Sequence, residues 1–403
     1  SALNANTTGA YNTAIGYQAL NLNTTGVTNV AVGDSALSSS TTAVRNTIVG
    51  SSAASLITTG TNNTGLGFAV LQYTVTGQYN TAVGSQALYS NTASNNTAVG
   101  HCALVYNTTG TPNDAFGYQA LFNNTTGNQN VAVGYQALNT QTTGVNNTGV
   151  GYAALNKNVT GAYNVAVGTN TLFYNTANSN TAVGNQALQS NTTGTPNDAF
   201  GYQALYSNTT GYQNVAIGYQ SLYTMTGGDS NVAIGTQAGY SVTNAGGAGT
   251  FVGYHAGYSV SSAIYNTIVG YLAGENASTG ARNTIMGAVA GRALTTGTNN
   301  VIIGETAANN GTNNLTTGSY NTIIGSNTRT SAVGASGQIV IGYGNVGQGD
   351  NYVSIGQGGT NYIYNQYTVN ATWTKASDER IKTNIQDMPI GLDFINELKV
   401  KQY

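Results

Sequence analysis

A glycine recurs at a nearly fixed interval along most of this 403-residue chain, and a short apolar motif accompanies it. From Gly16 to Gly304 most steps are 17 residues long, two are 16 and one is 18. The anchor glycines are Gly16, Gly33, Gly50, Gly67, Gly84, Gly100, Gly117, Gly134, Gly151, Gly168, Gly184, Gly201, Gly218, Gly235, Gly253, Gly270, Gly287 and Gly304, with looser continuations at Gly325, Gly342 and Gly356. Such a period indicates stacked repeats and not a globular domain.

The repeat unit predicts the form of one coil. Residues 130–144 show its pattern, NVAVGYQALNTQTTG. Residues on both sides of the glycine favour strands, and the Asn, Thr and Gly of the second half favour turns. Seventeen residues are too few for a strand, a helix and two loops. We therefore expect an all-β fold, a parallel β-solenoid (β-roll) of about 21 coils, each with two short strands and two turns.

Stacking of the coils places equivalent residues above one another. Parallel strands lie about 4.8 Å apart, so the coils predict a rod on the order of 100 Å long. An asparagine precedes most anchors by four residues, and stacked amides can hydrogen-bond along the axis. An exposed amide row that binds glycans is the alternative. These asparagines include Asn12, Asn29, Asn46, Asn63, Asn80, Asn96, Asn130, Asn147, Asn164, Asn214, Asn231, Asn266, Asn283, Asn300 and Asn321.

Two positions of the repeat exchange large and small residues. In the first two-thirds of the chain the residue two before the anchor is mostly small (Ala132), and the residue four after it is leucine (Leu138). From about residue 250 the first position is large (Ile285) and the second is glycine (Gly291). Because cores tolerate exchanges that conserve volume, we predict that both positions share one packed layer.

The strand residues also predict a partner. Adjacent strand residues point to opposite faces, yet Ala132 and Val133 are both apolar, as are Ile302 and Ile303. One face is the coil interior, and nothing else in the chain can cover the other. The simplest cover is a parallel copy of the chain, so we expect an elongated homotrimer.

Composition excludes several classes of function. Charged residues are 5% of the chain and the net charge is −2, so no basic patch is available for nucleic acid or anionic lipid. The chain has no run of about 18 apolar residues, so we expect no membrane insertion. No signal peptide precedes the repeats, and we expect further sequence before Ser1. Cys102 is the only cysteine and is predicted to be a free thiol.

Few residues of the repeats are candidates for chemistry, and we predict no metal, nucleotide, cofactor or nucleophile site in residues 1–376. Asp114 and Asp198 stand where Thr or Val is usual. Three copies of each could gather carboxylates around a cation; a solvated face is the alternative. His101 and His255 are expected to be wall residues at the tyrosine position of the repeat.

Some of the repeated sequences have simpler explanations than a site. The segment NTTGTPNDAFGYQAL occurs identically at 107–121 and 191–205, which indicates a copied block of five coils that sets length. The Asn-Thr-Thr triplets match a glycosylation acceptor, but their fixed phase in the repeat favours turn chemistry.

The composition changes near the C-terminus. Ten of the 22 charged residues lie in 375–403, and the glycine period stops after Gly359. Apolar residues over 390–400 follow Pro389 with a spacing that predicts a short helix. We therefore divide the chain into a solenoid shaft at 1–359, closing strands and a linker at 360–376, and a third segment at 377–403.

The third segment contains the motifs SDERIKTNI at 377–385 and GLDFINEL at 391–398. These resemble the opening of the intramolecular chaperone of endosialidases and phage tail fibres (peptidase family S74). The resemblance covers only the start of that domain, and Val400 departs from it because many relatives carry proline there.

The resemblance implies a domain that directs trimerisation of a β-structured fibre and that often cuts itself off. By this resemblance the cut separates Ala376 from Ser377, with Lys382 assisting the serine. The repeats at about 10–356 are similar in type to the head of trimeric autotransporter adhesins, whose coils form parallel β-rolls in threefold bundles. Both resemblances imply a trimer.

These observations predict the structural shaft of a bacteriophage tail fibre, located on the virion and outside cells. Its expected partners are two further copies, other virion or fibre proteins and a host cell-surface receptor, for which a glycan is the expected class. A bacterial surface adhesin or self-assembling extracellular filament is the alternative. An ice-binding solenoid and a glycan-cleaving enzyme fit less well, because the threonines lie mostly in turns and the carboxylates are scattered. Apart from autocleavage, we expect no enzyme activity.

Overall fold

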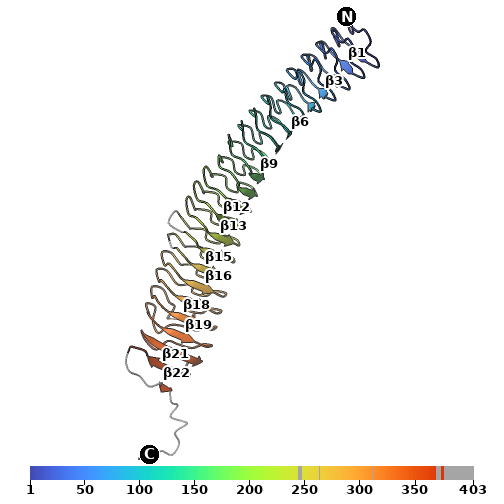
Figure 1. The fold of residues 1–403 in the computed structure, drawn as a ribbon. Helices are drawn as coiled ribbons and strands as arrows, with labels where there is room; N and C mark the ends of the chain where they lie inside the picture. Colours follow the sequence, from blue (N-terminus) through green and yellow to red (C-terminus); the bar gives the residue numbers. More distant parts are fainter. Residues whose placement is uncertain (244–246, 263, 312, 369–373, 376–403) are drawn as a thin grey trace, which may run out of the picture.

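The computed structural model describes residues 1–243, 247–262, 264–311, 313–368 and 374–375. These residues form a long, gently curved rod of stacked coils, with the N-terminus at one end and the last strands at the other (Figure 1). The rod is all-β, and its described residues contain no helix. The predicted parallel β-solenoid with a 17-residue repeat is thus confirmed. The helix expected over 390–400 lies outside the described residues.

Each coil, or rung, contributes one short strand that ends just before its anchor glycine. Successive strands pair in parallel with equivalent residues opposite one another, as Ala132 pairs with Ala115 and Gly149. The parallel strands are β1 (Thr13–Ile15), β2 (Val30–Val32), β3 (Thr47–Val49), β4 (Thr64–Leu66), β5 (Thr81–Val83), β6 (Asn96–Val99), β7 (Asn113–Phe116), β8 (Asn130–Val133), β9 (Thr148–Val150), β10 (Val165–Val167), β11 (Thr181–Val183), β12 (Asn197–Phe200), β13 (Asn214–Ile217), β14 (Val232–Ile234), β15 (Thr250–Val252), β16 (Thr267–Val269), β17 (Thr284–Met286), β18 (Val301–Ile303), β19 (Thr322–Ile324), β20 (Ile339–Ile341) and β21 (Tyr352–Gln357).

The sheet ends in antiparallel strands after the last parallel rung. Strand β22 (Asn361–Gln366) pairs antiparallel with β21, and β23 (Thr374–Lys375) pairs antiparallel with β22. This reversal uses the hydrogen-bonding edge of β21 on which another parallel rung would otherwise stack.

The anchor glycine is required by its backbone angle and by its close contact with the next rung. From Gly16 to Gly342 the φ angles of the anchors lie between 118° and 140°, a region that side chains disfavour. A Cβ added at Gly134 would lie 2.4 Å from the carbonyl oxygen of Gly151. The period of the sequence is therefore set by a backbone contact that only glycine permits.

The second strand that we predicted for each coil does not form. After each anchor come six residues that we call the loop wall, and within it the second and fourth residues mostly have positive φ, as Gln136 (53°) and Leu138 (53°) do. This alternation is incompatible with an extended strand. The wall is instead held by bonds between rungs, such as Leu138 N–H to Ala154 O at 2.9 Å. These bonds offset the cost of left-handed backbone at non-glycine residues, about 1 kcal/mol each.

The exchange of large and small residues does reflect one packed layer, as predicted. A Cβ added at Gly274 would lie 3.0 Å from Cδ1 of Ile268 and 3.1 Å from Cδ1 of Ile285. The same atom added at Gly257 would lie 2.5 Å from Cδ1 of Phe251. The large side chains from the strands thus fill the space that leucine occupies in earlier rungs.

The asparagine ladder is also confirmed. The Asn283 N–H and Nδ2 donate to Asn266 Oδ1 at 2.9 and 3.3 Å, and Nδ2 also donates to Gly297 O at 2.9 Å. The Asn300 N–H and Nδ2 then donate to Asn283 Oδ1, both at 3.0 Å. From Asn29 onward the ladder asparagines are at most 1% exposed. A glycan-binding amide row at this position is therefore excluded.

A second buried polar ladder, seven residues after the anchors, was missed by the sequence reasoning. Asn124 Nδ2 donates to Asn107 Oδ1 at 2.9 Å and to Gly127 O at 3.0 Å. The Asn-Thr-Thr asparagine is thus buried inside the turn, in agreement with turn chemistry. From Met225 to Leu294 this position is apolar, so the core loses polar groups in the same part of the chain where the large strand residues appear.

The turn directly after each second-ladder residue is hydrogen-bonded to a backbone carbonyl group of the next rung. The backbone N–H groups of Thr125, Thr126 and Gly127 all donate to Thr142 O, at 2.9, 3.2 and 3.3 Å. The Thr125 hydroxyl donates to the same oxygen at 3.1 Å. Three converging N–H groups resemble the concave sites that bind anions, and here the carbonyl of the next rung fills the position.

Removal of one ladder amide should weaken its rungs strongly. We expect Asn283→Ala to cost roughly 3 kcal/mol, because Gly297 O and Asn300 N–H lose their partners while buried. Amide hydrogen exchange in the adjoining strands should then be about 100-fold faster. Asn276→Ala, on the exposed wall of the neighbouring rung, is the matched control and should leave exchange nearly unchanged. Equal effects of the two changes would contradict the ladder's role.

The packed layer can be tested with a double-mutant cycle. Ile285→Ala should cost roughly 3 kcal/mol by leaving a cavity, and Gly291→Leu should overpack the layer against Ile285 and Ile302. Together they restore the arrangement of the earlier rungs, so denaturant unfolding should show the pair to be more stable than the sum of its parts by at least about 1 kcal/mol. Strict additivity would show that the two sites do not share space.

Candidate functional site: the outer walls of the rod

The predicted autocleavage residues, Ser377 and Lys382, lie outside the described residues, as does Ala376. Their chemistry therefore stays a prediction. Among the described residues, no three His, Cys, Asp or Glu side chains come together as a metal site would require. The same residues include no helix long and apolar enough to cross a membrane. The features of the described rod that can recognise a partner are its outer rows of side chains.

The most regular of these rows is the residue directly before each anchor glycine, which we call the outer row. Every member is a large apolar residue that points away from the coil interior, and none is fully buried. Val133, for example, is 37% exposed beside the fully buried Ala132. The members are Ile15, Val32, Val49, Leu66, Val83, Val99, Phe116, Val133, Val150, Val167, Val183, Phe200, Ile217, Ile234, Val252, Val269, Met286, Ile303, Ile324, Ile341 and Ile355.

The rows on either side of the outer row include charged residues. Asp114 and Asp198 lie two residues before the outer row, on the same face of the strands, half-buried and exposed respectively. Asp34 and Glu305 directly follow anchors on the other side. In one chain Asp114 and Asp198 are five rungs apart and are not brought together. The consistent apolar character of the outer row is thus a property of that row and not of the whole surface.

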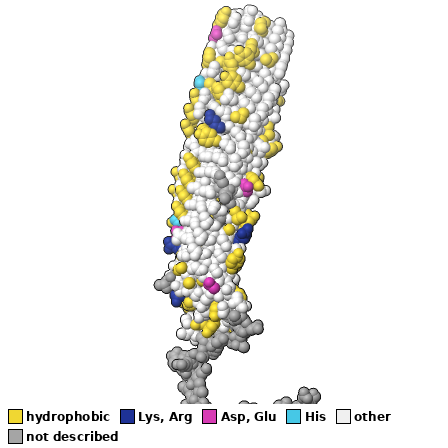
Figure 2. Space-filling view, turned by 90° about the vertical axis from the view of Figure 1, so that its left-hand side faces the viewer, with side chains coloured by type: hydrophobic (Ala, Val, Ile, Leu, Met, Phe, Trp, Pro, Cys, Tyr) yellow, Lys and Arg dark blue, Asp and Glu magenta, His cyan; other side chains and the backbone are white. Residues whose placement is uncertain are grey.

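Aromatic side chains stack along the loop wall in two rows. In the row directly after the anchors, the rings of Tyr118, Tyr135 and Tyr152 are nearly parallel, with centroids 5.0 and 5.2 Å apart. A second row lies five residues after the anchors and includes Tyr206, Tyr223, Tyr240 and Tyr258, with centroids 5.2, 5.2 and 5.0 Å apart. Apolar side chains accordingly run in lines along the rod, with charged side chains sparse among them (Figure 2).

A row of glutamine amides lies between the two aromatic rows, two residues after the anchors. Gln203 Nε2 donates to Gln186 Oε1 at 2.8 Å, Gln220 donates to Gln203 at 2.9 Å, and Gln237 donates to Gln220 at 3.0 Å. Each amide uses one N–H and one oxygen position in this chain. A further N–H and a further lone pair on each amide stay available at the surface.

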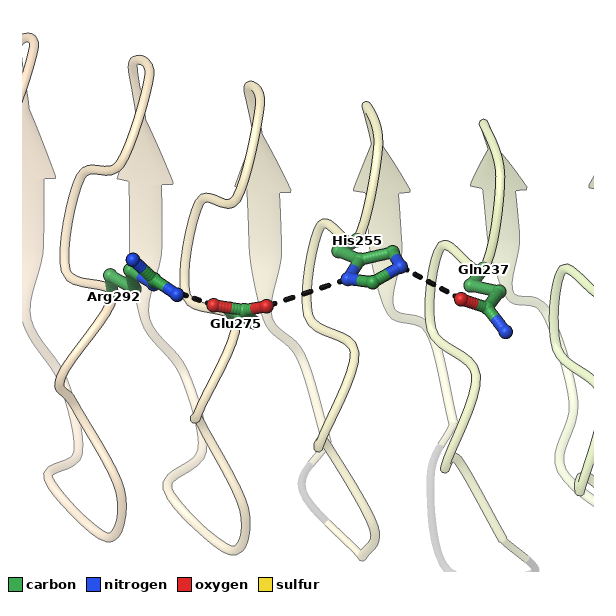
Figure 3. A network of polar contacts seen from close by, with 4 residues as sticks. All are labelled: Gln237, His255, Glu275 and Arg292. Carbon is green, nitrogen blue, oxygen red and sulfur yellow. Dashed lines mark hydrogen bonds and ion pairs between the residues drawn. The ribbon is translucent and has the colours of Figure 1, made fainter.

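Polar contacts continue from the glutamine row into a small ionic network (Figure 3). His255 Nε2 lies 2.7 Å from Gln237 Oε1, and His255 Nδ1 lies 3.4 Å from Glu275 Oε1. Arg292 Nε donates to Glu275 Oε2 at 2.5 Å. The network holds the carboxylate of Glu275 between two basic side chains, His255 and Arg292.

The two histidines occupy different rows, contrary to our expectation. His101 is at the tyrosine position, where its ring stacks on Tyr118 with centroids 5.6 Å apart. His255 follows Tyr254 and therefore lies in the glutamine row. Both are wall residues, as predicted, and neither is near a second histidine.

Cys102 is a buried free thiol in the glutamine row. Its Sγ donates to Gln86 Oε1 at 3.4 Å and lies 3.8 Å from His101 Nε2. Burial raises the pKa of the Cys102 thiol, so the unreactive protonated form is favoured. The site therefore has the character of a structural cysteine and not of a reactive one.

The raised pKa predicts slow chemical labelling of Cys102. Because only the thiolate reacts, the native thiol should react with iodoacetamide more slowly at pH 8 than the thiol of the urea-unfolded chain. The pH at which the labelling rate reaches half its plateau should also be higher for the native protein. Rates measured by mass spectrometry over a range from neutral to alkaline pH would show this, and a lower native midpoint would contradict it.

A comparison with protein-family models and with curated proteins finds no match to this chain. The two resemblances seen in the sequence therefore rest on their quoted motifs alone. The aromatic and glutamine rows were not predicted, although their signal is present: tyrosine and glutamine recur at fixed positions of the repeat. Without the wall geometry, it could not be recognised that the tyrosine and glutamine rows lie next to each other.

Proposed function

We propose that this chain is a stiff fibre shaft that associates lengthwise with copies of itself through the outer row. The observation that carries this proposal is that every rung presents a large apolar side chain at that position, while the rows on both sides vary. Ten of these side chains are 36 to 60% exposed in the single chain. We call this continuous line of contacts along the outer row the seam. A fibre shaft needs it because one contact per rung aligns the copies along their whole length.

The size of the seam is adequate for a stable association. Partly exposed side chains repeated along the rod offer on the order of 800 Å² of apolar surface, close to one partner's share of a standard interface. Monomeric proteins rarely expose contiguous apolar patches much larger than a few hundred Å². A pair of chains or a three-chain bundle would each cover the seam on all copies at once, and we propose the homotrimer because both sequence resemblances imply three copies.

The surroundings of the seam support its proposed place in the assembly. Asp114 and Asp198 lie on the strand face but outside the outer row. At the edge of the proposed contact, their carboxylates can stay in solvent. Burial of such carboxylates without partners would be costly. The proposed contact is therefore centred on the outer row, and it leaves the loop wall free.

The motifs at 377–403 support a more specific proposal, the shaft of a bacteriophage tail fibre. The C-terminal segment would direct trimerisation, and cleavage between Ala376 and Ser377 would release it afterwards. A bacterial surface adhesin would use the same shaft with a membrane anchor. A virion-attachment domain encoded in the same gene would favour the fibre, and a membrane anchor would favour the adhesin.

The seam can be tested by placing a charge in it. Val133→Asp should prevent or dissociate assembly, because three copies would bury three carboxylates at one level of the bundle. Native mass spectrometry and sedimentation should show a trimer for the unchanged protein and smaller species for the variant. A single-chain species for the unchanged protein would refute the proposal.

Two variants control for effects on the fold of the single chain. Thr126→Asp adds the same charge on the exposed turn that precedes the same strand and should keep the trimer. Val133→Thr keeps the shape of the side chain and should weaken assembly only modestly. If Val133→Asp forms normal trimers, the outer row is not the contact.

A further inference from the structure

The loop walls over residues 186–258 carry a surface that the proposed assembly does not use. We call it the Tyr-Gln strip, and its members belong to the first aromatic row, the glutamine row and the second aromatic row. They are Tyr202, Tyr219, Gln186, Gln203, Gln220, Gln237, Tyr206, Tyr223, Tyr240 and Tyr258. All are partly accessible, and Tyr202 and Tyr219 are 43% and 48% exposed.

The strip lies on the wall that faces away from the sheet. Figure 3 shows this wall at Gln237, which is in the glutamine row, and at Glu275 and Arg292, which hold the position of the second aromatic row. The strands stand behind these side chains in that view. A ligand on the strip would therefore approach from the side opposite the strands, and association through the outer row would leave it accessible.

Two successive rungs carry all three groups of the strip, and the rungs on either side carry one or two of them. The ring centroids of Tyr206, Tyr223 and Tyr240 follow one another at 5.2 Å, with planes within 10° of parallel. Parallel rings in contact at this centroid distance are offset, so part of each ring face stays uncovered. The four rungs from Gln186 to Gln237 each also offer a free amide N–H and a free lone pair from their glutamine.

The strip is uncharged along its length. Glutamine carries no charge, and tyrosine is normally neutral near pH 7. Burial together with the neighbouring hydroxyls of Tyr258 and Tyr223 raises the pKa of Tyr240 further. The first charged groups in line with the strip are those of the His255–Glu275–Arg292 network at its C-terminal end. The strip thus combines aromatic ring faces with uncharged amides that have free hydrogen-bonding groups. Such a surface is suited to a ligand with apolar C–H faces and many hydroxyls.

We propose that the Tyr-Gln strip binds a linear, neutral glycan that runs along the rod with one sugar per rung. The rung spacing of about 4.8 Å is close to the length of one pyranose unit in an extended chain. Each sugar would then place a C–H face on a tyrosine ring and hydroxyls against a glutamine amide. This inference rests on the proposed fibre, which would carry such a surface for a target, but the strip itself exists on a single chain.

Binding should depend on glycan length and on the central tyrosine. Isothermal titration with cellohexaose and hexa-N-acetylchitohexaose should show at least one of them binding at least tenfold more tightly than its trisaccharide, because the longer chain occupies more rungs. Tyr223→Ala should weaken that binding at least tenfold. Tyr223→Phe keeps the ring and the stack and should bind within threefold of the unchanged protein.

The matched control is Tyr163→Ala, which removes a tyrosine that is 59% exposed on a turn outside the strip and should bind within twofold. Circular dichroism and native mass measure fold and assembly separately. Failure of the unchanged protein to bind either hexasaccharide at millimolar concentration would overturn the proposal, as would an equal loss in Tyr163→Ala. Dissociation of the oligomer by Tyr223→Ala would make the strip a contact between copies and would also overturn it, whereas loss of glycan binding with an intact trimer leaves the assembly proposal standing.

Discussion

Hydrogen bonding between equivalent residues of neighbouring rungs is the interaction on which the rest of this structure depends. A coil this thin has little interior, so its backbone groups find their partners one rung above or below. The bond from Gly151 N–H to Val133 O, 2.7 Å long, links the anchors, and that from Leu138 N–H to Ala154 O links the walls. Any residue out of phase would leave such groups unpaired while buried.

This requirement explains where the repeat tolerates variation in length. The 16-residue step between Gly84 and Gly100 loses its residue between Asn91 and Asn96, which belong to the two buried polar ladders. In the longer step before Gly325, Leu315 N–H donates to Ala308 O, as Asn124 N–H does to Leu121 O in a regular rung, so the additional residues of the sequence come between Ala308 and Leu315. The strand, the anchor and the first four residues of the loop wall keep their lengths because their backbone groups pair between rungs, whereas the segments on either side of the second ladder vary in length.

The core and the surface follow different rules along the same rod. Inside, large and small residues exchange positions within one packed layer, so that Phe251 and Ile285 occupy space left by glycines. Outside, the outer row stays apolar while the neighbouring rows carry threonine, aspartate, tyrosine or glutamine. A rod built this way has one face with a constant property and other faces free to vary, which is what a self-associating shaft with a separate recognition surface requires.

The period, the ladder at Asn283 and the exchange at Ile285 and Gly291 could all be predicted from the sequence, because stacking makes the repeats an internal alignment of their own. The single strand per rung could not be predicted. Nothing in residue types such as Gln136 and Leu138 indicates a left-handed backbone, and only hydrogen bonds between rungs make that backbone favourable.

The sequence by itself determined that this chain is a stack of equal rungs, since a glycine that must touch the next rung imposes its spacing on everything between. Tertiary structure alone decided which rows lie next to one another on the walls. His255 and Glu275 are 20 residues apart yet 3.4 Å from each other, because the second and fifth positions of successive loop walls meet. Because left-handed and right-handed residues alternate in the loop wall, its side chains follow neither the strand period nor the helix period. Their adjacency can therefore be seen only in the three-dimensional structure.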